Sequence, residues 1–357
     1  MSSAKRLCFW TILIALTIVA TVVGLELLVR ALDPQAYIHP RYQYSERLSQ
    51  TLLPSTEMVA ALPGAWRFVY TTSEYGFRAP TMAVSNRYDR PNVVVLGDSY
   101  SFGNGVNDGE EYPAVLAGLL GACANVVNLG VPGYGLTQEI RLFYEFGQAY
   151  DPAIVVLQFS DNDPDDNLFY EVTDIEDGRF VFKADQSLGT FLRKVKNALS
   201  ESRIQRSQLY NFLRNTAYET FRERHLGQEI GPHGDPRGRE ALYSALLDLL
   251  VRDLDGRGID VVLFGVGGHL AQFPKIAAKV QALSDEGLVA YLPSEPWFEG
   301  ESDYATPEGH AWGAKAHRIV AEHTAPALKA ILAARADAAS RQRLSGGPGL
   351  ACRAEIG

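Results

Sequence analysis

The stretch that decides the fold is NVVVLGDSYSFG, residues 92–103. Its apolar run Val93–Leu96 lies between Pro91 and Gly97, a pattern typical of a short strand buried on both faces. Ser99 follows directly, at the carboxyl end of that strand. Ligands of open parallel sheets bind at this edge. The stretch therefore predicts an α/β protein with Ser99 as a candidate site residue, although a serine here could also serve only as a helix N-cap.

Other short apolar runs also end in glycine-rich or polar loops. Residues 124–129 lead to Gly133, and residues 154–159 lead to Asn162. No side chain crowds the backbone amide of a glycine such as Gly133. A further run at 258–265 follows an amphipathic helical pattern. This alternation predicts parallel strands joined by helices.

Three blocks carry a resemblance to a known family. They are Gly97-Asp98-Ser99, the run NLGVPGYG at 128–135, and Ser160-Asp161-Asn162-Asp163. In this order they resemble the SGNH/GDSL hydrolases, although Ser160 stands where that family usually has glycine. The resemblance implies a flavodoxin-like three-layer α/β/α sandwich with a central parallel sheet. It also implies a nucleophile at Ser99, an oxyanion hole formed by Ser99, Gly133 and Asn162, and no metal or organic cofactor.

The same resemblance implies a late Asp-x-x-His block that supplies an acid and a base. From Asp303 this spacing ends on a threonine, whereas counting back from the helical pattern at 312–322 ends one residue after His310. We therefore expect His310 as the base, with Asp303 or Glu308 as the acid. His317 falls inside the helical pattern and is expected to be structural. Upstream, the segment at 75–78 looks like a G-x-R motif found in membrane-anchored relatives.

The N-terminal segment has the pattern of a membrane anchor. Lys5 and Arg6 precede residues 7–25, which carry no charge, and Glu26 follows. Such a run is just long enough to span a bilayer core, and the preceding cations favour a cytoplasmic N-terminus. We expect an uncleaved anchor with the rest of the chain outside the cytoplasm, at a bacterial inner membrane facing the periplasm. A cleaved signal peptide is the alternative.

Composition limits the partners. The net charge of −9 disfavours nucleic acid, because phosphate contacts need clustered Lys and Arg. Basic residues do gather within the expected insertion, which could cap the site near anionic groups or be a solvated helix face. The expected organisation is a cytoplasmic N-terminus and anchor at 1–32, an irregular lead-in with one or two short strands at 33–91, a hydrolase-like domain at 92–335 with a helical insertion at about 168–235, and a disordered tail at 336–357.

These patterns predict a serine esterase or lipase-type hydrolase that uses a Ser-His-Asp/Glu triad. A serine hydroxyl is a weak nucleophile until a base accepts its proton, which is why such a triad is needed. The expected substrate is an ester-bearing small molecule, a lipid or an acylated glycan. Two alternatives stay open: an O-acetyltransferase or deacetylase acting on an envelope polysaccharide, and a non-catalytic envelope scaffold.

Overall fold

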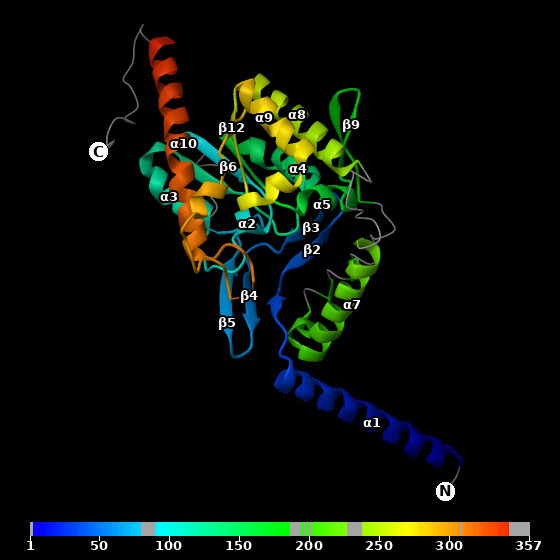
Figure 1. Ribbon diagram of the computed structural model, residues 1–357. Coiled ribbons are helices and arrows are strands. Elements are labelled where there is room, and N and C mark those ends of the chain that lie inside the picture. Colours follow the sequence, from blue (N-terminus) through cyan, green and yellow to red (C-terminus); the bar gives the residue numbers. More distant parts are fainter. Residues whose placement is uncertain are drawn as a thin grey trace.

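The computed structural model describes residues 3–79, 90–185, 194–195, 198–199, 202–226, 238–307 and 309–342. A five-stranded sheet of parallel neighbours lies at its centre, in the order β12-β11-β8-β6-β7 (Figure 1). The chain enters the sheet at β6, continues to β7 on one side and then crosses to β8 on the other. The topological switch point therefore lies at the carboxyl end of β6. The strands are β6 Asn92–Leu96, β7 Asn125–Asn128, β8 Pro152–Phe159, β11 Asp260–Gly265 and β12 Ala290–Tyr291.

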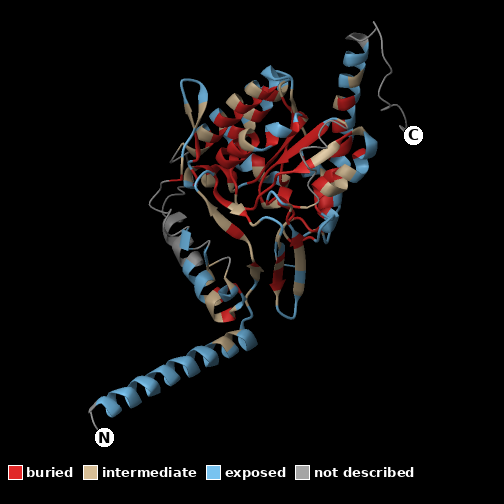
Figure 2. Ribbon diagram, turned by 180° about the vertical axis from the view of Figure 1, so that it is seen from behind, coloured by how far each residue is buried: buried red, intermediate tan, exposed pale blue. Residues whose placement is uncertain are grey.

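Helices cover both faces of this sheet. Val93 and Val95 of β6 belong to one apolar cluster, which includes residues of α3 and α10. Val94 and Leu96 belong to the opposite cluster, with residues of α4, α8 and α9. This alternation follows from the two-residue side-chain period of a strand. The three-layer α/β/α arrangement confirms the expected fold class, and Figure 2 shows the buried residues concentrated in the sheet and its facing helix surfaces. The helices are α2 Ser99–Phe102, α3 Tyr112–Leu120, α4 Leu136–Glu145, α5 Asp163–Phe169, α8 Arg239–Gly256, α9 Pro274–Asp285 and α10 Ala314–Gln342.

The lead-in is more regular than expected, and the prediction of an irregular segment was wrong. It forms an antiparallel sheet in the order β1-β4-β5 and a separate β2-β3 hairpin. These strands are short and only partly buried, so their sequences lack a strong alternating pattern. Pairing partners up to 24 residues apart in the chain decide their conformation. The strands are β1 Tyr37–His39, β2 Tyr42–Ser45, β3 Ser49–Leu52, β4 Glu57–Leu62 and β5 Trp66–Thr71.

The insertion and the C-terminal region also depart from the expected boundaries. A hairpin of β9 Thr173–Glu176 and β10 Arg179–Phe182 forms around Asp177-Gly178, as expected. The helical part described is the short 3-10 helix η4, Arg203–Arg206, and α7, Gln208–Leu226. Helix α10 continues to Gln342, so the expected disordered tail does not begin at residue 336. Alanine-rich sequence there favours helix over disorder, and residues 343–357 lie outside the described part.

The N-terminal helix α1, Ser3–Leu32, projects from the rest of the molecule (Figure 1). Residues 4–32 form a helix long and apolar enough to cross a membrane, and no residue of its most apolar stretch is buried. Exposed apolar surface on this scale is costly in water. The helix is therefore a candidate membrane span, as its sequence predicts.

Candidate active site

Ser99 begins α2 where β6 ends. The turn requires glycine at position 97, because a Cβ there would lie 2.2 Å from Ser101 Oγ. Asp98 is the N-cap of α2, and its Oδ1 accepts a hydrogen bond from the Tyr100 amide at 3.0 Å. Glycine and cap together turn the chain sharply at the sheet edge. Ser99 is thereby held at the topological switch point of the sheet.

His310 is the partner of Ser99. Its Nε2 lies 3.2 Å from Ser99 Oγ. The loop that carries it is fixed by Thr306, whose hydroxyl accepts from the His310 amide at 2.9 Å. Tyr100 packs on the imidazole with ring centroids 4.1 Å apart. Burial lowers the pKa of His310 to about 4, against a smaller opposing effect of the Trp312 backbone. The imidazole is therefore neutral near pH 7 and able to accept a proton.

The other imidazole nitrogen has no carboxylate partner within the described residues. His310 Nδ1 is buried without a hydrogen bond. Asp303 is exposed, and its Oδ2 accepts from the Ser302 hydroxyl at 3.0 Å. The structure therefore does not join Asp303 to the base. Glu308, the other candidate acid, lies outside the described residues.

The three expected oxyanion donors come from loops at the carboxyl ends of β6, β7 and β8. Neither the Ser99 nor the Gly133 amide donates to an acceptor within the described chain. Gly133 has φ +75°, a conformation that favours glycine. Asn162 Nδ2 donates to Asp166 Oδ2 at 2.7 Å, and the Asn162 side chain also lowers the pKa of Asp98 through a hydrogen bond. The fold thus supplies three N–H donors near the sheet edge.

Ser160 occupies the position where the SGNH/GDSL hydrolases usually have glycine. It lies at the centre of a buried cluster of oxygen atoms. Its Oγ lies 2.8 Å from Asp98 Oδ2, 2.7 Å from Asn162 Oδ1 and 2.9 Å from Asp163 Oδ1. One hydroxyl proton can serve only one of these three contacts. The Ser160 hydroxyl is the donor to whichever of these acceptors it serves, and Asp98 or Asp163 donates to Ser160 in return only when it carries a proton of its own.

Each of the two carboxyl groups also accepts a hydrogen bond from a backbone amide. The second oxygen of Asp98 accepts from the Tyr100 amide, and the second oxygen of Asp163 accepts from the Ser160 amide at 2.9 Å. Burial raises the pKa of Asp98, and burial together with Glu139 and Asp98 raises that of Asp163. Glu139 on α4 is itself buried, and its pKa is raised by burial and by Asp98. Burial therefore raises the pKa of both carboxyl groups behind Asn162, while their hydrogen bonds to Ser160 oppose the rise.

Arg78 supports α2 from the opposite end, a role that the sequence did not reveal. Its side chain is fully buried and donates to three backbone carbonyls, Phe102 at 2.9 Å, Gly103 at 2.6 Å and Val106 at 2.8 Å. It also donates to Asp108 at 3.1 Å. The Phe102 and Gly103 carbonyls mark the C-terminal end of α2. Arg78 thus joins the lead-in segment to the helix whose first residue is Ser99.

The two remaining histidines near the sheet have other roles. His317 is completely buried in α10, and its Nδ1 accepts from the Tyr112 amide at 3.1 Å. His269 Nδ1 accepts from the Asp161 amide at 3.1 Å. Neither has a hydrogen bond to Ser99. Among the described residues, no group of three or more His, Cys, Asp or Glu side chains could hold a metal ion.

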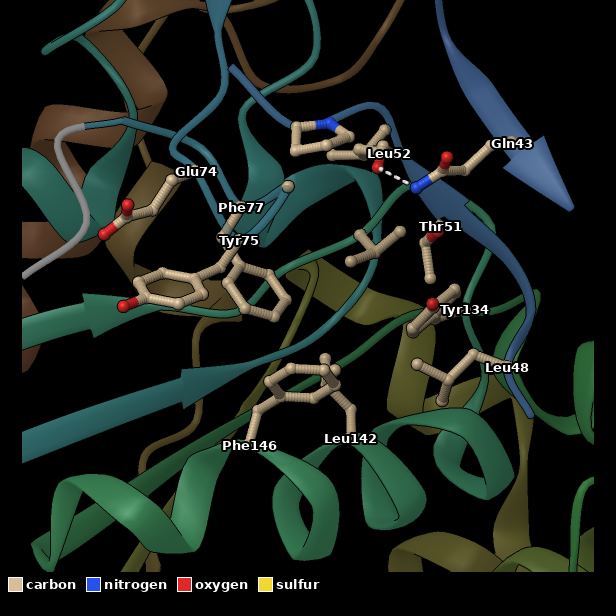
Figure 3. A pocket seen from close by; sticks show the side chains of 13 residues that line it. Gln43, Leu48, Thr51, Leu52, Glu74, Tyr75, Phe77, Tyr134, Leu142 and Phe146 are labelled. Carbon is tan, nitrogen blue, oxygen red and sulfur yellow. Dashed lines mark hydrogen bonds between the residues drawn. The ribbon is translucent and has the colours of Figure 1, made fainter. Parts of the chain in front are cut away.

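A cavity of about 190 Å³ lies on the lead-in side of the oxyanion loop (Figure 3). Val131 and Tyr134, on either side of Gly133 in sequence, line it together with Leu142 of α4 and Phe146, which directly follows that helix. Neither Ser99 nor His310 is among the lining residues. The cavity therefore is not the place where the Ser99–His310 pair would act.

Comparisons with known proteins give structural likeness at low sequence identity. No protein-family model and no curated protein sequence matches the chain. The crystal structure of TesA is 15% identical, covering 67% of this chain and 99% of TesA, with a TM-score of 0.41. A putative lipolytic protein of the G-D-S-L family from Desulfitobacterium hafniense is 12% identical, covering 66% and 98%, with a TM-score of 0.40.

A third similar structure is Axe2, an acetylxylan esterase from Geobacillus stearothermophilus. It is 14% identical, covering 66% of this chain and 92% of Axe2, with a TM-score of 0.40. Likeness at this level assigns neither a family nor an activity to the chain. The functional proposal therefore depends on the residues of the chain itself.

Proposed function

We propose that the chain is a serine hydrolase of the SGNH/GDSL type that cleaves an ester bond. The observation that carries this proposal is the 3.2 Å contact between Ser99 Oγ and His310 Nε2 at the switch point of the sheet. The ordered motif blocks around Ser99, Gly133 and Asn162 support it. A nucleophile in contact with a neutral base is the arrangement that acyl transfer requires.

In the proposed reaction, Ser99 Oγ attacks the ester carbonyl while His310 Nε2 takes the hydroxyl proton. The resulting oxyanion accepts hydrogen bonds from the Ser99 and Gly133 amides and the Asn162 carboxamide. The C–O bond then breaks, and His310 returns the proton to the departing alcohol. Water then attacks the acyl-enzyme as His310 takes one of its protons. The bond to Ser99 Oγ breaks, His310 returns that proton to Ser99, and the acid is released.

We further propose that Asp98 and Asp163 are neutral acids and that this state supports the oxyanion hole. Two carboxylates directly behind Asn162 would repel a developing negative charge. As neutral acids they instead donate to Ser160, and the Ser160 hydroxyl donates to Asn162 Oδ1 at 2.7 Å. Hydrogen bonds in such a chain polarise one another, which makes the Asn162 N–H a better donor.

The identity of the acid is a separate part of the proposal. For Nε2 to accept the Ser99 proton, the neutral imidazole must carry its own proton on Nδ1. Of the described groups, the Trp312 backbone is the one that stabilises the charged form of His310. Glu308, two residues before His310 in sequence, is the carboxylate candidate that we retain.

For location, we propose that α1 anchors the protein in a membrane with the α/β domain outside the cytoplasm. The exposed apolar helix and the cations Lys5 and Arg6 before it support this orientation. The expected substrates are ester-bearing molecules, lipids or acylated glycans that reach an extracytoplasmic site.

The direct test uses the purified full chain in detergent and a short-chain aryl ester. The Ser99→Ala variant is expected to lose turnover by at least about 10³-fold, a loss typical of removing a nucleophile. A Ser340→Ala variant, in which an exposed serine of α10 is changed, controls for general damage and is expected to remain active. Turnover by the Ser99 variant at the wild-type rate would refute the proposal, and transfer of the acyl group to a glycan rather than to water would identify a transferase.

A further inference from the structure

The candidate membrane helix α1 is joined to the insertion through Glu26, whose carboxylate lies at the N-terminus of α7. Glu26 of α1 accepts hydrogen bonds from Ser207 Oγ at 2.8 Å, the Gln208 amide at 3.0 Å and the Leu209 amide at 2.9 Å. The amides belong to the first turn of α7, where helix N–H groups lack intrahelical partners. Glu26 thus caps a helix about 180 residues away in sequence, and Figure 1 shows α7 beginning beside the end of α1.

The residues directly after α1 strengthen this junction. The Gln35 amide donates to Gln208 Oε1, and Asn215 Nδ2 donates to Gln35 Oε1 at 3.0 Å. Gln35 therefore binds α7 at two positions, one at its start and one about two turns later. The segment that leaves α1 is held against the insertion and is not a free tether.

The charge pattern of α1 fixes the depth of this junction in a bilayer. Residues 7–25 carry no charge, and Glu26 is the first charged residue after them. A carboxylate is costly in the hydrocarbon core, so Glu26 lies at the level of the headgroups when α1 spans a membrane. The groups hydrogen-bonded to Glu26 must lie at the same level. This places the start of α7, and η4 directly before it, at the membrane surface.

The composition of η4 suits that position. Arg203 and Arg206 are exposed, and Ile204 between them has 43% of its surface exposed. Exposed apolar side chains flanked by cations are typical of segments that lie in a membrane interface. Cations at the surface of an anionic membrane are attracted to its headgroups. The chain as a whole is acidic, with a net charge of −9, so this basic segment is a local exception.

We propose that η4 and the first turn of α7 form a membrane-binding surface, in which Ile204 enters the headgroup region and Arg203 and Arg206 bind anionic lipid headgroups. This surface rests on the proposed anchoring by α1. Together with the Glu26 cap it fixes the orientation of the α/β domain relative to the bilayer.

Site-directed spin labelling of the full chain in lipid nanodiscs tests the surface. On a background with Cys8, Cys123 and Cys352 replaced by serine, nitroxides are placed at Ile204→Cys, at Val19→Cys within α1 and at exposed Gln281→Cys on α9. Collisions with membrane-soluble oxygen and a water-soluble nickel complex report depth. We expect the labels at 19 and 204 to favour oxygen and the label at 281 to favour nickel.

The possible outcomes distinguish a failure of the proposed membrane-binding surface from a failure of the proposed anchor. If the label at 19 favours oxygen while that at 204 behaves like that at 281, the anchor stands and the surface is refuted. If the label at 19 favours nickel, the anchor fails and the surface fails with it. In nanodiscs containing phosphatidylglycerol, the pair Arg203→Glu and Arg206→Glu is expected to shift the label at 204 toward nickel by severalfold. Equal depth in pure phosphatidylcholine would refute the role of anionic headgroups.

Discussion

His310 Nε2 lies 3.2 Å from Ser99 Oγ, although 211 positions separate the two residues in the chain. They meet because the end of β6 and the loop before α10 both lie at the carboxyl edge of the sheet. Tyr100, the neighbour of Ser99, packs on the imidazole and helps to hold it in place. Helix α2 therefore presents the nucleophile Ser99 and, through the ring of Tyr100, also contacts the base.

The first prediction concerns pH. Burial lowers the pKa of His310 to about 4. A base works only when unprotonated, so kcat/KM should be constant near neutrality and should fall as the pH drops through about 4. A pH profile with an aryl ester measures this limb. A limb near 6.5 or above would show that burial does not dominate the pKa of His310, as expected if Glu308 is the acid on Nδ1.

The second prediction concerns the protonation of Asp163 in the oxygen cluster around Ser160. Asparagine at position 163 can accept from the Ser160 amide and donate to Ser160 Oγ, as a neutral acid does. Asp163→Asn should therefore retain kcat/KM within about threefold at pH 7. Asp163→Ala should lower kcat/KM roughly tenfold, which is the effect expected from the loss of about one hydrogen bond.

An ionised Asp163 that accepts the Ser160 proton would reverse this order. In that case the asparagine variant would lose as much activity as the alanine variant. Infrared spectroscopy provides an independent measurement, since a buried carboxylic acid has a carbonyl band that Asp163→Asn should diminish. Unchanged intensity of that band would contradict the assignment.

The third prediction concerns Arg78, which donates to the carbonyls of Phe102, Gly103 and Val106. Arg78→Ala leaves these buried carbonyls without their donor and removes the cation beside Asp108, so it should lower the free energy of unfolding by about 3 kcal/mol or more. Arg78→Lys should restore little, because a single ammonium cannot match the planar fork of donors. Chemical denaturation measures both, and full rescue by lysine would refute this role.

The fourth prediction compares the two candidate acids. Asp303 is exposed and bound to Ser302, so Asp303→Asn should change kcat/KM by less than about threefold, like other exposed substitutions. Glu308→Gln tests the other candidate under the same conditions. A loss of about 10²-fold or more would assign the acid to Glu308, and a large loss in the Asp303 variant alone would contradict the prediction.

Much of this fold could be predicted because its strongest signals are local. The apolar runs ending at Leu96 and Phe159 identified central strands, and Ser99 and His310 could be proposed as partners from their places in the chain. The function of Arg78 could not be predicted, since its acceptors are backbone atoms that carry no sequence signal. The hydrogen-bonding role of Ser160 likewise emerges only when Asp98, distant in sequence, is brought beside it.

The most direct test of the central claim is fluorophosphonate labelling of the purified full chain, followed by peptide mapping. We predict a covalent adduct on Ser99 that forms at least about 10²-fold more slowly in His310→Ala, because the serine then lacks its base. Labelling of the variant at the wild-type rate would remove His310 from the mechanism. Absence of an adduct on Ser99 in the folded wild-type protein would contradict the proposal that this chain is a serine hydrolase.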